Sequence, residues 1–421
     1  MKRIIVIIDS IDVNDSSGAK ANVGFVNSLQ SSGNVVYILH YSNSEIYLNG
    51  ITTYRIKEKR SSVLFLFSRI QRVFQRVTNF NINKYIENYL GFSLTYLNDV
   101  NSIKSALAVL LKEKKVDLII TLSQASSFRP HAAMLYFEQY HFMWLAYVHD
   151  PYPMACYPRP YDWVESGHYK KYKLMHRVLN SCRYIGYPSQ LLSKWMSTYY
   201  LNHDVSNSVI IPHQKVLVSE LADISIPNNL NIFREGNFTL LHAGSLMDAR
   251  NPTALIEAFV EFIEEFDSEH RKKIFLVFVG KPSKYSEYIK SNVLVNESII
   301  ISEDYIDFNI SFQLQKLATA NVIIEADAPF SPFLPGKFTH CVQANKTIFY
   351  LGPVVNECIR ILGNDYPFQA EINDKKKIKN NLRLLYNKWE EASNKLELNR
   401  PDVDLYLSSD YLNNCILKLD V

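Results

Sequence analysis

The stretch LLHAGSLMDARNPTALIEAF places a loop of small residues and a cation at the start of a helix. Gly244 and Ser245 follow an apolar run, and Arg250 comes shortly after them. We expect the helix to have Asn251 as its N-cap and Pro252 as its first residue. Glycine lets the backbone approach a ligand, and both the helix N-terminus and the guanidinium attract negative charge. This pattern predicts a phosphate site, and a capped helix with a solvated arginine is the alternative.

The stretch SPFLPGKFTHCVQANKTIFYLG, from Ser331 to Gly352, contains a second such combination. Gly336 and Lys337 stand where a short helix should begin, and His340 follows at helical spacing. Lys337 and the free amides of the first turn would form a second site for an anion. We therefore predict that Lys337 neutralises a pyrophosphate.

The first predicted strand ends in the polar loop of DSIDVNDSSGAKANVGFVNSL. Ser17 and Gly18 precede a helix there, and this arrangement favours an anion or an oxyanion. The loop is not G-x-G-x-x-G, so a dinucleotide cofactor and an oxidoreductase function are disfavoured. A plain turn between strand and helix is the alternative.

The stretch YVHDPYPMACYPRPYDW follows another buried strand and is dense in aromatic residues and proline. His149 and Asp150 end the strand. The aromatic side chains considered for stacking on a sugar ring are Tyr152, Tyr157, Tyr161 and Trp163. The stretch thus predicts sugar binding, and a structural histidine bonded to a nearby carbonyl is the alternative.

Bulk composition excludes several classes of protein. The chain has 421 residues, which favours two domains, and its 45 basic and 42 acidic residues give a net charge of +3, which does not suggest nucleic acid binding. Its 5 cysteines form no C-x-x-C pair, so neither a disulfide framework nor a zinc site is expected. The N-terminus reads as a buried strand, not a signal peptide, and no run approaches the length of a spanning helix. We expect a cytoplasmic protein.

Short apolar runs rich in Ile and Val alternate with amphipathic segments, including a helix expected over Ile103–Lys115. This alternation predicts parallel, doubly wound sheets with strands buried on both faces. The expected strands of the first half are Arg3–Asp9, Asn34–His40, Asp117–Ser123, Met143–Asp150, Tyr184–Ser189 and Ser208–His213. Those of the second half are Phe238–Gly244, Lys273–Pro282, Ser298–Ser302, Asn321–Asp327 and Lys346–Gly352. A polar stretch separates the halves, so we predict two Rossmann-like domains, at residues 1–214 and 237–398, joined by a linker at 215–236.

The segment SSVLFLFSRIQRVFQRVTNF, Ser61–Phe80, combines apolar residues with arginines at helical spacing. Two interpretations stay open. The segment is an interfacial helix that touches an anionic membrane, or it packs on its domain with its arginines solvated.

The chain resembles the GT-B glycosyltransferases, and among them the retaining family 4. HAGSLMDARNPTALIEAF resembles the family's small-residue loop followed by a basic residue and a helix, and FLPGKFTHCVQANKTIFYLG resembles its C-terminal signature. VHDP resembles the His-Asp at the end of an N-terminal strand, and YPSQLLSKWM with VIIPHQ resembles the approach to the interdomain linker. The resemblance implies two Rossmann-like domains facing a cleft, an acceptor side and a donor side, and a C-terminal helix, here within 399–421, that crosses back to the N-terminal domain.

The resemblance also implies roles for individual residues. His149 would contact the transferred sugar, and Gly18 would lie by the donor phosphates or the acceptor. Arg250 and Lys337 would hold the diphosphate, so that the leaving group is stabilised without a metal. The predicted catalytic residues are His149, Asp150, Arg250 and Lys337.

The sequence departs from the family where two glutamates are usual, because Pro332 and His340 occupy their positions. His340 can still hydrogen-bond a ribose hydroxyl, and Glu325 or Asp327 could supply a carboxylate. The predicted donor-binding set is Gly18, Gly244, Ser245, Arg250, Glu325, Asp327, Gly336, Lys337 and His340, and the predicted acceptor-binding set is Ser17, Tyr152, Tyr157, Tyr161 and Trp163.

The predicted function is transfer of a hexosyl group from a UDP-, GDP- or dTDP-linked sugar to a glycan or lipid-linked acceptor, in the synthesis of a surface glycan. The enzyme would be cytoplasmic, at the inner face of the membrane if Ser61–Phe80 touches it. Two alternatives stay open: a degenerate protein that binds a sugar nucleotide or a partner transferase, and a nucleotide-sugar 2-epimerase.

Overall fold

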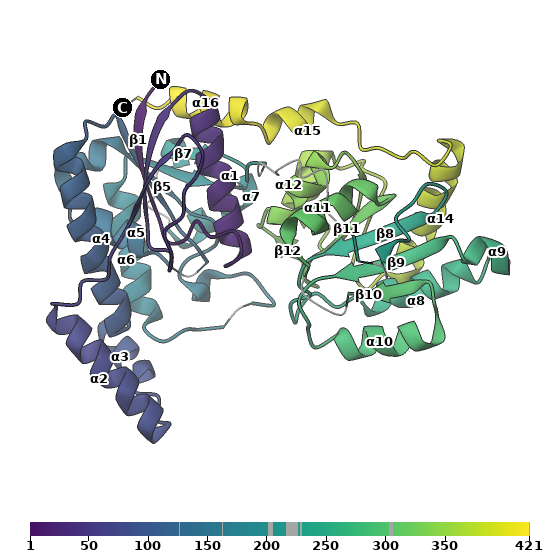
Figure 1. Ribbon diagram of the computed structural model, residues 1–421, viewed down its shortest axis with the longest axis horizontal. Coiled ribbons are helices and arrows are strands. Elements are labelled where there is room, and N and C mark those ends of the chain that lie inside the picture. Colours follow the sequence, from purple (N-terminus) through teal and green to yellow (C-terminus); the bar gives the residue numbers. More distant parts are fainter. Residues whose placement is uncertain are drawn as a thin grey trace. The chain divides into compact units, whose positions relative to one another are not determined.

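The computed structural model describes residues 1–125, 127–161, 163–200, 205–215, 226–227, 230–302 and 306–420. The chain forms two compact units (Figure 1). The first comprises Met1–Val216 with Leu407–Val421, and the second comprises Leu217–Tyr406. Most of the linker expected at 215–236 lies outside the described residues.

The first unit contains a seven-stranded sheet in the order β3-β2-β1-β4-β5-β6-β7, in which every pairing is parallel. Its elements are β1 (Arg3–Ile8), α1 (Ser17–Ser31), β2 (Val35–His40), β3 (Thr52–Arg55), α2 (Val63–Thr78), α3 (Asn83–Leu90), α4 (Leu94–Glu113), β4 (Leu118–Leu122), α5 (Arg129–Met134), η1 (Glu138–Met143), β5 (Trp144–Tyr147), η2 (Met154–Cys156), α6 (His168–Ser181), β6 (Tyr184–Tyr187), α7 (Gln190–Tyr199), η3 (Val205–Asn207), β7 (Ser208–Ile210) and α16 (Ser409–Leu417).

The second unit contains a six-stranded parallel sheet in the order β10-β9-β8-β11-β13-β15 and a two-stranded sheet of β12 and β14. Its elements are β8 (Phe238–Ala243), α8 (Thr253–Ile263), α9 (Ser268–Arg271), β9 (Ile274–Val279), α10 (Ser286–Val295), β10 (Ile299–Ile301), α11 (Phe308–Leu317), β11 (Ala320–Ile324), β12 (Phe330–Ser331), α12 (Gly336–Gln343), β13 (Thr347–Leu351), β14 (Val355–Asn356), α13 (Glu357–Leu362), β15 (Gln369–Ala370), α14 (Lys375–Glu391) and α15 (Pro401–Tyr406).

Helices cover both faces of each large sheet, which is why the strand sequences are almost continuously apolar. In β1, Ile5 and Ile7 join a core with residues of α4, α5 and α6. Ile4 and Val6 point to the opposite face and join a core with residues of α1. The alternation follows from the two-residue period of a strand and fixes the direction in which each strand end presents its side chains.

The C-terminal helix α16 packs on α1 of the first unit, as the resemblance implied. Leu412 and Ile416 are fully buried in the same core as β1. Ser32 Oγ donates a hydrogen bond to the carbonyl of Ser409 at 3.1 Å. In the preceding segment, α15 belongs to the second unit.

The predicted strands all form, with differences at their ends and edges. The polar edge strand β3 and the short strands β12, β14 and β15 had no apolar run to reveal them. β7 is half-buried rather than buried on both faces, because it lies at the sheet edge. Helix α4 is longer than expected, and α8 begins at Thr253, after Pro252. The N-cap is Pro252, which has no capping side chain, so the prediction of Asn251 as N-cap is wrong by one residue; Asn251 Oδ1 accepts from the Thr253 amide at 3.0 Å from the position before the cap.

Among the described residues, no helix has both the length and the apolar character needed to cross a bilayer.

Candidate functional site

Arg250 forms an ion pair with a buried carboxylate at the carboxyl end of β11. Its Nη2 lies 3.1 Å from Oε1 of Glu325, which is 3% exposed. Glu325 is itself positioned by its backbone amide, which donates to the Leu351 carbonyl at 2.8 Å. The loop between β8 and α8 therefore holds the Arg250 guanidinium against the end of β11. This geometry is present without a ligand.

Lys337, in the first turn of α12, lies beside the end of β8. Its Nζ is 3.4 Å from Nε2 of the buried His242, whose Nδ1 lies 3.1 Å from the Val322 carbonyl. Because a carbonyl can only accept, Nδ1 carries the imidazole proton, and Nε2 accepts from the ammonium. Burial and the neighbouring cations lower the pKa of His242, so the ring is neutral and suited to that role.

The ammonium of Lys337 is held where its charge is disfavoured. Burial, and next the charge of Arg250, lower the pKa of Lys337 to about 7, while Glu325 acts in the opposite direction. A desolvated lysine next to a second cation gains from any anion that enters. The lowered pKa of Lys337 is therefore the electrostatic sign of a site that favours negative charge.

Two glycines allow the loops at this site to approach each other closely. Gly244 has a φ of +135°, and a Cβ added there would lie 3.0 Å from Nζ of Lys337. A Cβ on Gly280, after β9, would lie 2.5 Å from the carbonyl oxygen of Gly244. Any larger residue at either position would have to displace backbone or the lysine.

The N-terminus of α12 adds backbone donors to the two cations. Pro335 precedes the helix and Gly336 opens it, with no atom within 4 Å of the position that a Cβ on Gly336 would take. Pro335 gives no side-chain cap, and the Phe338 amide donates to the Pro335 carbonyl at 2.9 Å, so the backbone donors that α12 can offer a ligand are the amides of Gly336 and Lys337. Arg250, Lys337 and the start of α12 form what we call the cation site.

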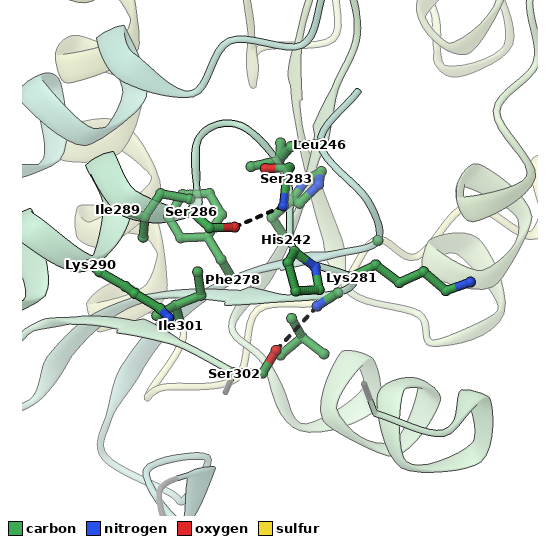
Figure 2. A pocket seen from close by; sticks show the side chains of 14 residues that line it. His242, Leu246, Phe278, Lys281, Ser283, Ser286, Ile289, Lys290, Ile301 and Ser302 are labelled. Carbon is green, nitrogen blue, oxygen red and sulfur yellow. Dashed lines mark hydrogen bonds between the residues drawn. The ribbon is translucent and has the colours of Figure 1, made fainter. Parts of the chain in front are cut away.

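A pocket adjoins the cation site at the carboxyl ends of β8, β9 and β10 (Figure 2). His242 and Gly244 belong to its lining and thus connect it to Lys337. The other lining residues are Leu246, Phe278, Val279, Gly280, Lys281, Pro282, Ser283, Ser286, Ile289, Lys290, Ile301 and Ser302. The hydrogen bonds drawn, Ser283 amide to Ser286 Oγ at 2.8 Å and Gly280 amide to Ser302 Oγ at 3.3 Å, fix the loop that follows β9. The pocket therefore combines apolar walls with a rigid polar rim.

The other predicted donor residues of the second unit differ in burial and in their partners. Ser245 is exposed in the loop after β8. Asp327 is exposed after β11, and its Oδ2 accepts from Nδ2 of Asn373 at 2.6 Å. His340 is half-buried on α12, with its ring 4.8 Å from that of Phe308 in an edge arrangement.

In the first unit, His149 is buried and bonded at both ring nitrogens. Nε2 lies 2.8 Å from Oδ1 of Asn22, and Nδ1 lies 3.2 Å from Nε2 of His213. Burial, and next His213, lower the pKa of His149, so it is neutral. It connects the end of β5 to α1, which is the structural role that the sequence analysis left open.

The loop after β1 is closed by a glutamine that sequence reasoning did not single out. Gln124 Nε2 donates to Ser16 Oγ at 3.0 Å, and its Oε1 accepts from the Ser10 amide at 3.1 Å. A Cβ on Gly18 would lie 3.1 Å from Gln124 Cγ, so Gly18 is needed for this contact. Ser17 is exposed at the first position of α1.

The predicted acceptor residues separate into a core residue and surface residues. Tyr152 is 1% exposed and stacks on Phe128 with ring centres 3.8 Å apart, so it belongs to the core and offers no face to a sugar. Tyr157 and Tyr161 are half-buried, and their rings meet edge to face at 6.5 Å. Trp163 is exposed. Asp150 is half-buried, and its charge, after burial, raises the pKa of Tyr157.

Several residues of the candidate site were not predicted. His242, Gly280 and the lining of the pocket belong to this group, and Asn22 completes the bonding of His149. His242 follows an apolar run and stands two residues before Gly244, and Gly280 directly follows the run IFLVFV, so polar or small residues at the ends of parallel strands were the available signal.

Among the described residues, no group of three or more His, Cys, Asp or Glu side chains could hold a metal ion.

Solved glycosyltransferases share the architecture of the whole chain. A glycosyltransferase from Rickettsia africae matches with a TM-score of 0.64 and 14% identity, over 99% of this chain and 97% of that chain. The chain has the GT-B fold. HepE from Anabaena, solved in complex with UDP, matches with a TM-score of 0.61 and 9% identity, over 99% of this chain and 98% of that chain. Trehalose-6-phosphate synthase from Burkholderia multivorans matches with a TM-score of 0.57 and 10% identity, over 99% of this chain and 98% of that chain. No protein-family model and no curated protein matches the sequence. The predicted pair of Rossmann-like domains is thereby confirmed.

Proposed function

We propose that the protein is a glycosyltransferase that uses a nucleoside-diphosphate sugar. The observation that carries the proposal is the cation site: Arg250 on Glu325, and Lys337 on His242 with a pKa lowered to about 7. A diphosphate supplies the negative charge that this site lacks. The shared fold with solved glycosyltransferases, one of them in complex with UDP, supports the same ligand class.

The nucleoside part of the donor fits the adjoining pocket. Phe278, Ile289 and Ile301 provide apolar surface for a planar base, and His242 and Gly244 connect the pocket to the cation site. Glu325, Asp327 and His340 are the candidates for contacts to ribose or sugar hydroxyls. The base and the diphosphate would then occupy the ends of neighbouring parallel strands, the usual ligand position in such sheets.

In the transfer, the bond between the anomeric carbon and the diphosphate oxygen breaks, and an acceptor hydroxyl forms the new bond and loses its proton. Negative charge develops on the departing diphosphate. Arg250, Lys337 and the amides that open α12 offset it through donors already in place, an electrostatic contribution that is often the largest in catalysis. No metal is required for this stabilisation, and we infer retention of anomeric configuration by resemblance to the retaining family.

The acceptor is proposed to be a glycan or a lipid-linked sugar of a surface polysaccharide. Ser17, Tyr157, Tyr161 and Trp163 stay candidates for its binding, whereas Tyr152 is withdrawn because it is buried. His149 and Asp150 stay candidates for sugar contacts at the end of β5. For His149 this requires that a bound sugar replaces one of its two ring hydrogen bonds.

The test is calorimetric titration and thermal shift with UDP-, GDP- and dTDP-sugars, followed by an assay for nucleoside diphosphate release with candidate acceptors. One donor should stabilise the fold, by about 2.7 kcal/mol at 100 times its dissociation constant. Lys337→Ala should remove this stabilisation, and Lys316→Ala, an exposed lysine of the same unit on α11, should not.

Binding without turnover would favour the alternative, a sugar-nucleotide-binding protein without activity. Absence of any shift with all three donor classes would contradict the proposal.

A further inference from the structure

Helix α2 packs on the first unit with a side that carries Ser68, Gln71 and Gln75 together with the half-buried Leu64 and Phe65. Ser68 is buried, and its Oγ donates to the Phe65 carbonyl at 2.8 Å. Gln71 is half-buried, and its Nε2 lies 3.5 Å from Oδ1 of Asn83 on α3. Gln75, one turn further, is half-buried on the same side. A helix of a soluble protein normally turns its apolar side inward, whereas α2 leaves most of its large apolar side chains in solvent.

The opposite side of α2 is a continuous apolar stripe exposed to solvent. Its members are 42% to 77% exposed and follow one another at helical spacing of three or four residues: Val63, Leu66, Phe67, Ile70, Val73, Phe74 and Val77. Two tyrosines of α3, Tyr85 and Tyr89, are also exposed. We call these nine residues the α2–α3 face. Contiguous apolar surface of this kind marks an interaction site, whereas single exposed apolar residues need no explanation.

The charges along α2 are all positive, and the acidic residues that flank the segment, Glu58 and Glu87, pair with Arg60 and Lys171. From Lys59 to Ile86 the sequence contains six basic residues and no acidic one. Arg69, Arg72 and Arg76 are all exposed and form a row along one flank of the apolar stripe, as their spacing on the helix requires. Figure 1 shows α2 and α3 projecting together from the helices that cover the sheet of the first unit.

We propose that the α2–α3 face docks on the surface of an anionic membrane. Helix α2 would lie in the plane of the interface over a length of about 24 Å. Its apolar stripe would enter the boundary between headgroups and acyl chains, and the arginine row would contact lipid phosphates. Tyr85 and Tyr89 have the amphipathic character of residues that lie at the headgroup level.

The charge pattern favours a membrane over a second copy of the chain. In a symmetric dimer through this face, arginine rows would meet, and the flanking acidic residues Glu58 and Glu87 already pair with Arg60 and Lys171. An anionic bilayer would supply lipid phosphates as negative partners for each arginine of the row. The inference does not rest on the proposed transferase activity.

The experiment is co-sedimentation of the full chain with vesicles of phosphatidylcholine, with and without phosphatidylglycerol. Wild type should bind the anionic vesicles and lose binding as salt rises. The triple variant Leu66→Gln/Ile70→Gln/Val73→Gln should bind at least about 100-fold more weakly, and Arg69→Gln/Arg76→Gln roughly 10- to 30-fold more weakly. These side chains are exposed, so the variants keep the folded core.

The matched control is Val109→Gln/Phe142→Gln, which removes two exposed apolar side chains of the same unit outside the α2–α3 face. Equal weakening of the control would overturn the proposal, as would unchanged binding of the triple variant. Equal binding to vesicles without phosphatidylglycerol would overturn the assignment to an anionic surface. A dimer in solution that the triple variant abolishes would assign the face to a second copy.

Discussion

The strand ends of the two units carry opposite surpluses of charge. In the first unit, Arg129 bridges two buried carboxylates, with Nε 3.0 Å from Asp9 Oδ1 and Nη1 2.6 Å from Asp99 Oδ2. In the second unit, Arg250 and Lys337 share the single carboxylate Glu325. The first cluster has one cation for two anions, and the second has two cations for one anion.

In both clusters, burial disfavours the charged form of a residue whose charge is in excess. It raises the pKa of Asp9 in the first unit, and it lowers the pKa of Lys337 in the second. The first cluster has further protein partners, since Tyr41 donates to Asp99 at 2.8 Å and Ser127 lies 3.1 Å from Arg129, and only Oδ2 of Asp9 has no hydrogen-bond partner among the described carboxylate oxygens of this cluster. The second adjoins a pocket and an uncapped helix start. We infer that the first cluster organises the fold and the second awaits an anion.

The largest effect on stability is expected when the cluster of Asp9, Asp99 and Arg129, which we call the acidic cluster, loses its cation. Arg129→Met leaves two buried carboxylates without their partner, so the free energy of unfolding of the first unit should fall by about 3–5 kcal/mol. Urea denaturation, monitored by a probe in the first unit, measures this change in the free energy of unfolding. Arg3→Met, which removes the exposed pair with Asp117, is the control and should change stability little. A small effect of Arg129→Met would mean that the cluster is not structural.

The second prediction concerns the excess of positive charge at the cation site and the pH dependence of donor binding that follows from it. In the proposed function, Lys337 binds the diphosphate as the cation, and the bound anion would raise its pKa above the value of about 7 in the free protein. Donor affinity should therefore be full below pH 7 and fall by about tenfold per pH unit as the pH rises further, until the pKa of the complex is reached.

Calorimetry with a nucleotide sugar is suitable because its diphosphate does not titrate in this range. Lys337→Met should bind weakly and without this pH dependence. A wild-type affinity independent of pH between 7 and 9 would show that Lys337 does not act as the titrating cation.

Sequence reasoning found every strand of the two large sheets except β3 and β15, because parallel strands covered on both faces have continuous apolar sequences. It also placed Arg250 and Lys337 at helix starts, where local chemistry indicates anion binding. It could not pair Lys337 with His242, because a contact between residues remote in sequence depends on how β8 and α12 meet. The burial of Tyr152 was missed for the same reason: an aromatic residue in a proline-rich loop has no periodicity that tells core from surface.

The smallest effect isolates one hydrogen bond of the acidic cluster. Tyr41→Phe removes the donor to Asp99 but keeps the ring, whose centre lies 5.1 Å from the Arg129 guanidinium. Because Asp99 retains Arg129, the free energy of unfolding should fall by only about 1–2 kcal/mol. Tyr47→Phe, at an exposed tyrosine of the same unit, is the control and should have no effect. The variant should also leave donor affinity unchanged. A loss of affinity would show that the two clusters are coupled, and the division into a structural cluster and a binding cluster would then fail.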